Sequence, residues 1–205
     1  AAGLCHSDLH FIEGKYPTPV PTVLGHESAG IVEAVGRDVT YVKPGDHVIT
    51  CLSVFCGHCE FCLTGHMSIC QTPEVKMLPG KARRMRWKGA HLNQYLNLSS
   101  FAEQMLVHEH ALVKITPEMP LDVAALIGCG VMTGYGSIIH TAKVEPGSTV
   151  AIAGCGGIGL AAVNGAAIAG AGRIIAIDKD PGKLELASKM CATDGVIADD
   201  DSVKR

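Results

Sequence analysis

The most constraining feature of this 205-residue sequence is an uncharged, strand-like run that ends in a glycine-rich turn. Residues 148–153 (STVAIA) are rich in β-branched side chains, which suits a strand buried on both faces. They lead into residues 154–159 (GCGGIG), which fit the pattern G-x-G-x-x-G. A helix of small residues is expected over 160–169 and a second strand over 173–177. This order of elements predicts the strand–turn–helix–strand unit of a dinucleotide-binding fold.

The glycine-rich turn and Asp178, which follows the second expected strand, are expected to contact different parts of a dinucleotide. Gly154 makes the tight turn, Gly156 lets the backbone approach a pyrophosphate, and Gly159 allows close packing of helix on strand. Asp178 follows Gly154 by 24 residues, near the spacing expected for a carboxylate that binds the ribose hydroxyls. It would repel the 2′-phosphate of NADP, so NAD is the expected cofactor. A second interpretation is that Asp178 caps a helix expected over 181–190, and the two roles are compatible.

Four cysteines form a compact C-x2-C-x2-C-x7-C pattern at positions 56–70. Four thiolates fill the tetrahedral shell of Zn²⁺ and leave no open position, so Cys56, Cys59, Cys62 and Cys70 predict a structural zinc site. An iron–sulfur cluster and four unrelated thiols are the alternatives; the absence of a Cys-Pro ending weighs against the cluster. Disulfides are disfavoured because the chain has nine cysteines and no visible secretion signal.

Three further candidate ligands are scattered along the chain. Cys5, His26 and Cys129 would form the Cys2His shell of a catalytic zinc, which keeps one position open. Spacing alone does not link them, and a lone cysteine or histidine is more often an ordinary core residue. Cys51, Cys155 and Cys191 show no pairing pattern, so we expect them to be small buried apolar side chains.

Composition excludes several classes of protein. Apolar residues make up 47% and charged residues 18% of the chain, with a net charge of −3, so it is neither disordered nor a basic nucleic-acid binder. The basic residues between 76 and 88 are interpreted as a solvated loop. The uncharged stretch 149–172 is attributed to the glycine-rich unit above, not to a membrane span. We expect a soluble cytoplasmic protein without a membrane or nucleic-acid partner.

The sequence of the first half of the chain predicts a β-rich domain. Short strands are expected over 30–35, 47–50, 102–108 and 111–115, separated by turn residues, which suggests a barrel-like domain. Helical segments are expected over 121–126 and 131–142. They lead into the nucleotide-binding unit.

Together these motifs resemble the zinc-containing medium-chain alcohol dehydrogenases. The segment that begins Gly25-His26-Glu27 and continues to Val39 is similar to that family's zinc signature, and residues 126–136 are similar to its third-ligand segment. The resemblance implies an α/β plus β architecture. An incomplete GroES-like β-barrel catalytic domain would span 1–130, with a structural zinc lobe at 56–70. The first half of a Rossmann domain would span 131–205.

The resemblance also implies roles for individual residues. Cys5, His26 and Cys129 would bind the catalytic zinc, with Glu27 behind the metal. Asp8 would orient the ligand histidine, and Ser7 and His10 would form a proton relay. The residues implied to contact NAD are His6 at the pyrophosphate, Thr133 and Ile158 near the nicotinamide, Lys183 near the adenosine ribose, and the turn residues Gly154, Gly156, Gly157 and Gly159 with Asp178. Tyr16 and Leu52 would line the substrate pocket.

The implied activity is the reversible oxidation of an alcohol to an aldehyde or ketone by hydride transfer to NAD, with two zinc ions per chain. One alternative is a formaldehyde dehydrogenase that acts on S-hydroxymethyl thiol adducts. A polyol dehydrogenase of the same superfamily is another, disfavoured because such enzymes often replace the Cys129-type ligand with Glu. A non-catalytic zinc-binding module is the third.

The resemblance implies a small-molecule alcohol or aldehyde substrate and a homo-oligomer, with a dimer favoured over a tetramer. It also implies strands before Cys5 and a second half of the nucleotide-binding sheet that this sequence does not contain. We therefore expect the 205-residue chain alone to be inactive.

Overall fold

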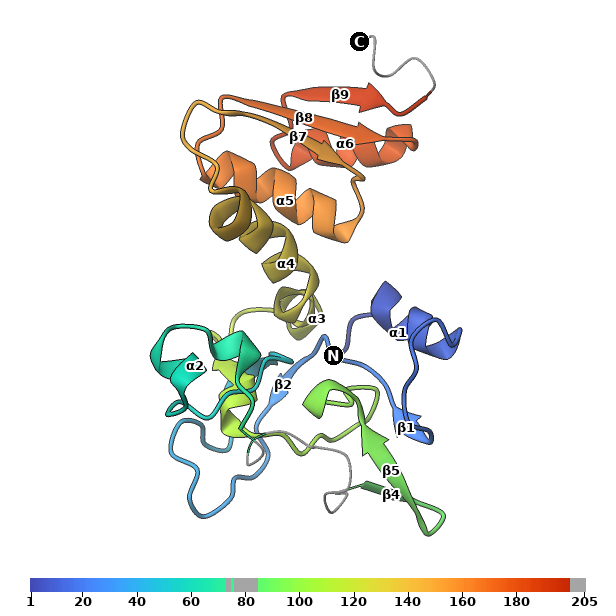
Figure 1. The fold of residues 1–205 in the computed structure, drawn as a ribbon, viewed down its shortest axis with the longest axis vertical. Helices are drawn as coiled ribbons and strands as arrows, with labels where there is room; N and C mark the ends of the chain where they lie inside the picture. Colours follow the sequence, from blue (N-terminus) through green and yellow to red (C-terminus); the bar gives the residue numbers. More distant parts are fainter. Residues whose placement is uncertain (73–74, 76–84, 200–205) are drawn as a thin grey trace. The chain divides into compact units, whose positions relative to one another are not determined.

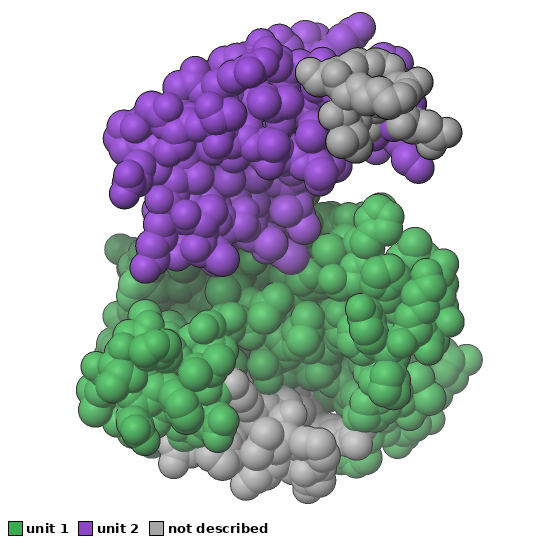
Figure 2. Space-filling view, turned by 45° about the horizontal axis from the view of Figure 1, so that its top comes forward, with its two compact units in different colours: residues 1–128 green, residues 129–205 purple. Residues whose placement is uncertain are grey.

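The computed structural model describes residues 1–72, 75 and 85–199. The chain divides into two compact units, Ala1–Gly128 and Cys129–Arg205 (Figures 1 and 2). The division falls two residues before the expected domain boundary. Of the expected basic loop, the part at 76–84 lies outside the described residues, whereas Arg86 belongs to a short strand.

Among its described residues, the first unit contains two three-stranded sheets. In one, β2 (Ala29–Ile31) and β6 (Leu112–Lys114) flank β3 (His47–Thr50), and both pairings are antiparallel. In the other, β5 (Ala90–Gln94) pairs in parallel with β1 (Thr22–Val23) and antiparallel with β4 (Met85–Trp87). These sheets do not close into a barrel within the described residues. The barrel expected from the sequence is therefore open in the part of the chain that the structure describes.

Two of the expected strands need correction. The strand expected over 30–35 is only the three-residue β2, because the pairing ends before the turn at 36–38. Residues 102–108 form no strand. Side-chain hydrogen bonds hold this segment instead, from Gln94 to the carbonyl of Leu106 and from Ser28 to the sulfur of Met105. A strand needs a partner backbone, and this segment has no ladder with the neighbouring described strands.

Short helices connect the strands of the first unit. They are α1 (His6–Ile12), α2 (Glu60–Leu63), α3 (Leu121–Ala125) and the 3₁₀ turns η1 (Met67–Ile69), η2 (Tyr95–Asn97), η3 (Glu109–Ala111) and η4 (Leu126–Gly128). Two small apolar cores stabilise the unit. Ala29 and Ile49 pack on α3, whereas Val54 and Leu98 pack around the cysteine-rich segment.

The second unit is a parallel sheet with helical crossovers, as the sequence predicts. Strands β7 (Thr149–Ala153), β8 (Arg173–Asp178) and β9 (Asp194–Ile197) lie in sequential order. Helix α5 (Gly157–Ile168) connects the first two strands, and α6 (Pro181–Lys189) connects the last two (Figure 1). Helix α4 (Gly130–Gly136) continues into a π-helical segment, η5 (Ser137–Ala142), and packs on α5.

Small residues bring α4 and α5 close together. A Cβ at Gly134 would overlap the carbonyl of Ile158, and a Cβ at Gly165 would press on the backbone of Tyr135. No single helix in the described residues is long and apolar enough to cross a membrane. Two successive helical segments, Leu121–Gly128 and Gly130–Ala142, meet the length and composition criteria only when taken together.

Candidate metal centres and nucleotide-binding turn

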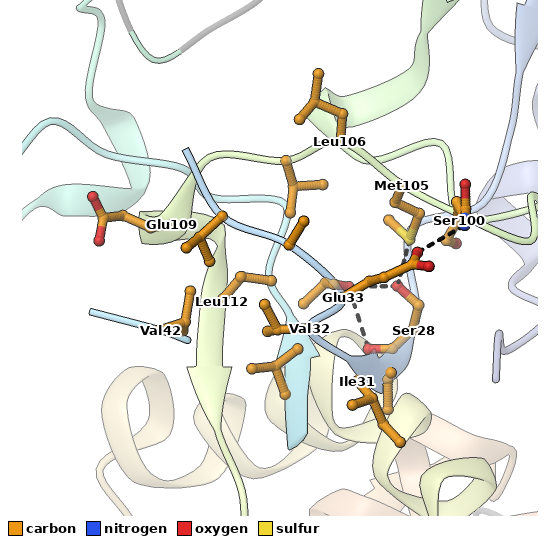
Figure 3. Close-up of a pocket in the computed structure, with 18 of the residues that line it drawn as sticks. Ser28, Ile31, Val32, Glu33, Val42, Ser100, Met105, Leu106, Glu109 and Leu112 are labelled. Atoms are coloured by element: carbon orange, nitrogen blue, oxygen red, sulfur yellow. Dashed lines mark hydrogen bonds between the residues drawn. The ribbon is translucent and has the colours of Figure 1, made fainter. Parts of the chain in front are cut away.

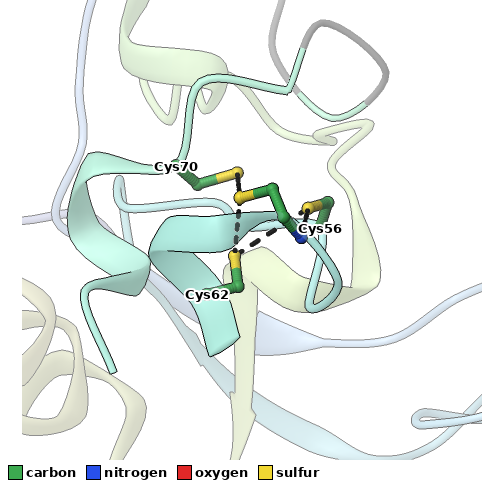
Figure 4. Close-up of side chains that lie close together, drawn as sticks. Cys56, Cys62 and Cys70 are labelled. Atoms are coloured by element: carbon green, nitrogen blue, oxygen red, sulfur yellow. Dashed lines mark hydrogen bonds between the residues drawn. The ribbon is translucent and has the colours of Figure 1, made fainter. Parts of the chain in front are cut away.

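The four cysteines of the 56–70 segment converge on one point (Figure 4). Cys59 is the N-cap of α2, Cys62 lies within α2, and Cys70 ends η1, so local helix geometry aims their side chains inward. The Sγ–Sγ distances are 3.8 Å for Cys56–Cys62, 3.5 Å for Cys59–Cys62 and 3.8 Å for Cys59–Cys70.

These distances fit a tetrahedral zinc site. A zinc–sulfur bond of about 2.3 Å places tetrahedral thiolates about 3.8 Å apart. A disulfide would bring two sulfurs to about 2.05 Å, and all nine cysteines are free thiols. The structure therefore favours a metal over disulfides, and the complete set of four sulfur ligands is typical of a structural site.

Burial and hydrogen bonds shift the pKa values of Cys56 and Cys62 in opposite directions. Burial raises the pKa of Cys56, but hydrogen bonds from the Thr72 hydroxyl and from the backbone of His58 and Cys59 outweigh it and lower the pKa to about 5. Burial and hydrogen bonds with the other thiols of the cluster raise the pKa of Cys62 to about 11. The lowered pKa of Cys56 favours the thiolate, which is the form that binds metal.

A second group of potential metal ligands lies in the first unit. Ligand atoms of Cys5, His26 and Glu27 fall within 4.8 Å of one another. Cys5 is the N-cap of α1 and its Sγ accepts the N–H of Ser7 at 3.5 Å. His26 and Glu27 are buried in the loop before β2. Cys129 is the first residue of the second unit and the N-cap of α4.

Asp8 orients the ring of His26. The Nδ1 atom of His26 lies 3.3 Å from Oδ2 and 3.4 Å from Oδ1 of Asp8, and both side chains are almost fully buried. Asp8 is itself held, because its Oδ1 accepts the N–H of Gly25 at 2.9 Å. With Nδ1 directed at a carboxylate, Nε2 is the ring nitrogen available to a metal, as is usual for a histidine ligand.

Three other expected site residues, His6, Ser7 and His10, also lie on α1. Ser7 and His10 are three residues apart and half-buried, so they share one side of the helix. The ring of His10 lies 6.5 Å from that of exposed His6 and 5.5 Å from that of Tyr16. Tyr16 is mostly exposed.

Leu52, the other residue expected to line a substrate pocket, packs against the core beside the cysteine cluster.

The glycine-rich turn has the conformation that its sequence predicts. Gly154 has φ of +88°, a value that favours glycine. A Cβ at Gly159 would overlap the carbonyl of Gly154, so only glycine fits there. Gly156 is the N-cap of α5, which begins at Gly157 and exposes Ile158. The unpaired N–H groups of a helix N-terminus form an anion-binding site.

Asp178 ends β8 beside this turn. Its Oδ2 accepts the N–H of Cys155 at 2.7 Å and its Oδ1 accepts the N–H of Asp180 at 2.9 Å. These bonds, the Asp180 bond first, hold the pKa of Asp178 below its usual value despite burial. The Nζ atom of Lys183 lies 3.9 Å from Oδ1. The cap of α6 is Asp180, whose side chain accepts the N–H of Gly182, so the interpretation of Asp178 as that cap is wrong.

The remaining residues singled out in the sequence differ in their exposure to solvent. Thr133 is exposed on α4. Cys155 is fully buried, as expected for a small apolar side chain, and Cys51 is half-buried. Cys191 is exposed, contrary to expectation, because it lies in a surface turn after α6 with φ of +80°.

Two residues that contact candidate metal ligands were not predicted from the sequence. Thr72 donates to Cys56 at 3.1 Å, and its nearness to Cys70 in sequence was the available signal. The ring of Tyr95 meets the ring of His26 edge-on at 5.7 Å, and no local pattern marks this contact.

One groove in the first unit is separate from these sites. A groove of about 610 Å³ runs between β2, the segment after it and residues 100–109 (Figure 3). Its walls include Val32, Val42, Leu106 and Leu112, and none of the expected catalytic or metal-binding residues lines it. The groove therefore does not mark the chemical site.

Comparison with known proteins shows which family this chain resembles. Residues 1–117 match the family model of the alcohol dehydrogenase GroES-like domain. The chain is 47% identical over 204 residues to an alcohol dehydrogenase class-3 from Myxine glutinosa, covering 97% of this chain and 54% of that protein. It is also 47% identical over 203 residues to an S-(hydroxymethyl)glutathione dehydrogenase from Escherichia coli, covering 97% and 55%.

A solved structure shows the same fold. The crystal structure of an alcohol dehydrogenase zinc-binding domain protein from Burkholderia ambifaria matches with a TM-score of 0.87 at 39% identity, covering 96% of this chain and 54% of that one. The chain therefore belongs to the zinc-containing medium-chain alcohol dehydrogenase family. It spans about half the length of the relatives that it matches.

Proposed function

We propose that this chain contributes the zinc-binding part and the first half of the cofactor-binding part of an NAD-dependent alcohol dehydrogenase. The observation that carries the proposal is the buried histidine His26, oriented by Asp8 and grouped with Cys5 and Glu27, in a member of this family. A purely structural zinc module would need only the four-cysteine cluster. Such a module would not require the buried Asp8–His26 pair beside the thiol of Cys5.

The catalytic zinc would be held by Cys5, His26 and Cys129, with Glu27 behind it. When bound, zinc supplies Lewis-acid chemistry that lowers the pKa of an alcohol hydroxyl. Asp8 keeps the His26 ring in the orientation that a ligand requires.

Ser7 and His10 would carry the proton from the alcohol toward solvent. They share one side of α1. Ser7 precedes Asp8, which contacts the ring of His26, and the N–H of Ser7 donates to the Sγ of Cys5.

NAD would bind at the turn between β7 and α5. The N-terminus of α5 would face the pyrophosphate, with Gly156 allowing close approach and His6 adding a contact. Asp178 and Lys183 would contact the adenosine ribose, and Thr133 and Ile158 would lie near the nicotinamide. A negative Asp178 disfavours the 2′-phosphate of NADP.

A specific observation favours one class of substrate among the alcohols. Two of the relatives at 47% identity are named alcohol dehydrogenase class-3 and S-(hydroxymethyl)glutathione dehydrogenase. We therefore propose the S-hydroxymethyl adduct of a thiol with formaldehyde as a candidate substrate beside simple alcohols. We further propose a cytoplasmic homo-oligomer, with a dimer as the first expectation.

The decisive experiment uses protein expressed from the complete reading frame. Metal analysis should find two zinc ions per chain, and absorbance of NADH should report turnover of a primary alcohol or of S-(hydroxymethyl)glutathione. His26→Ala should remove one zinc and abolish turnover while the fold is kept. Cys191→Ser is the matched control, because Cys191 belongs to neither cluster. One zinc per chain and no turnover in the unmodified protein would favour the non-catalytic module instead.

A further inference from the structure

Both carboxylate oxygens of Asp178 accept hydrogen bonds from the backbone of the protein itself. One carboxylate oxygen accepts the N–H of Cys155 at 2.7 Å, and the other accepts the N–H of Asp180 at 2.9 Å. Asp178 is 9% exposed and Cys155 is fully buried, so neither bond is easily replaced by water. The side chain therefore joins the carboxyl end of β8 to the middle of the glycine-rich turn that follows β7.

The backbone explains why this connection matters for the turn. Gly154 donates its N–H to the carbonyl of Ile177 at 2.8 Å, which ends the pairing of β7 with β8. The next N–H, that of Cys155, is directed at Asp178. After it the chain enters α5 through its N-cap, Gly156. The Asp178–Cys155 bond is thus a side-chain contact at the point where the chain turns toward the proposed pyrophosphate position.

We propose that Asp178 is a positioning residue that fixes the glycine-rich turn through the N–H of Cys155, in addition to contacting the ribose. The inference rests on the proposed function for the identity of the nucleotide. It implies that removing the Asp178 charge does not by itself convert the protein to NADP. The same change releases the turn that both cofactors need.

The choice of a carboxylate follows from donor and acceptor counting. Two N–H groups converge on residue 178, and a carboxylate offers two acceptor oxygens. Asparagine offers one acceptor and directs an NH₂ donor at the other N–H. Alanine offers none, which leaves two donors without their partner. A buried donor without a partner is costly. We therefore expect the turn to become less ordered when Asp178 is replaced by Asn, and less ordered still when it is replaced by Ala.

The test separates the turn from the ribose contact by using a nucleotide that lacks the ribose hydroxyls. Binding of 2′,3′-dideoxyadenosine 5′-diphosphate is measured by calorimetry on the full reading-frame protein. If Asp178 acted only on the ribose, Asp178→Asn would bind this probe as well as the unmodified protein or more tightly, because a negative charge near the phosphates is removed. The proposal expects the opposite sign, weaker binding by about three- to tenfold.

Hydrogen exchange measured without nucleotide gives a readout that does not depend on any cofactor. In the unmodified protein the Cys155 amide should exchange more slowly than that of exposed Gly156. Asp178→Asn should speed exchange in residues 154–158. Asp180→Asn is the matched control: it removes the same charge two residues away, and asparagine caps a helix as well as aspartate does. It should leave both exchange and probe binding unchanged.

The outcomes are distinct. Unchanged exchange in Asp178→Asn together with equal or tighter probe binding would overturn the positioning role. So would an Asp178→Ala protein that binds NADP as tightly as the unmodified protein binds NAD. If the substituted chains fail to fold, a Cys155 amide that exchanges as fast as Gly156 in the unmodified protein would overturn it. If the unmodified protein binds no adenine nucleotide while Asp178→Asn still speeds exchange, the proposed function fails and the positioning role stands.

Discussion

The backbone N–H of Gly25 donates a 2.9 Å hydrogen bond to Oδ1 of Asp8, and this bond connects α1 to the loop that carries His26. The same carboxylate lies 3.3 Å from Nδ1 of His26. One buried side chain therefore fixes both the backbone before the histidine and the direction of its ring. A metal ligand needs both, because its nitrogen must lie within a few tenths of an ångström of the right place.

Replacing Asp8 with Asn should impair the proposed catalytic zinc without unfolding the protein. The single amide oxygen would have to serve both the N–H of Gly25 and Nδ1 of His26. We expect zinc affinity or kcat/KM to fall about ten- to a hundredfold, as for other partners of ligand histidines. Metal analysis and NADH kinetics measure the effect. Asp38→Asn, at an exposed carboxylate, is the control and should be silent; a silent Asp8→Asn would contradict the orienting role.

Replacing Cys59 with Ser should remove the structural zinc and lower thermal stability. Cys59 contacts two other thiols of the cluster, and metal binding at such a site contributes directly to folding free energy. We expect zinc content to drop from two ions to one and the Tm to fall. A chelator should lower the Tm of the unmodified protein in the same way. If Cys59→Ser kept two zincs and its Tm, the cluster would not be a metal site.

Replacing Gly25 with Ala should be far more disruptive than replacing Gly14. Both glycines have positive φ, +94° and +70°, which costs an alanine about 1–2 kcal/mol. At Gly25 the new Cβ would also press on Ser100 and Phe101, whereas it meets open space at Gly14. We expect a total loss of about 2–5 kcal/mol at Gly25 by adding the cost of overpacking. Urea denaturation of both variants measures the difference, and equal losses would refute the close contact.

The ion pair between β8 and β9 should give a pH-dependent contribution to stability. Arg173 donates two 2.9 Å hydrogen bonds to Asp194. These, and then the bond from Thr193, hold the pKa of Asp194 below its ordinary value of about 4. Because the folded pKa is the lower one, the stabilisation is present above about pH 4 and is lost as the pH falls below it.

Asp194→Asn should therefore lower the Tm at pH 7, and the difference from the unmodified protein should shrink toward pH 3. The effect should be modest, because the pair is partly exposed and screened by solvent. A pH series of thermal melts at constant ionic strength measures it. A Tm difference that stays constant from pH 7 to pH 3 would show that Asp194 acts through packing and not through its charge.

Local patterns in the sequence were sufficient for two parts of the protein. The four-cysteine site could be predicted because its ligands lie within 15 residues, where one short turn and one helix decide where each thiol points. The strand–turn–helix unit was predictable for the same reason. Gly154 has a positive φ that favours glycine, and at Gly159 a Cβ would overlap the carbonyl of Gly154.

Contacts between distant segments were decided only by the tertiary structure. Cys5 and His26 lie 21 residues apart, and the bonds of Asp8 to Gly25 and His26 bring them together. The segment 102–108 has strand-forming residues, but a strand also needs a partner backbone, and it found none among the described strands. Sequence alone placed Asp178 beside the turn, whereas the fold directed its two oxygens at two buried N–H groups. Local sequence sets the conformation of a turn or helix, but the partner of a buried polar group depends on which segments the folded chain packs together.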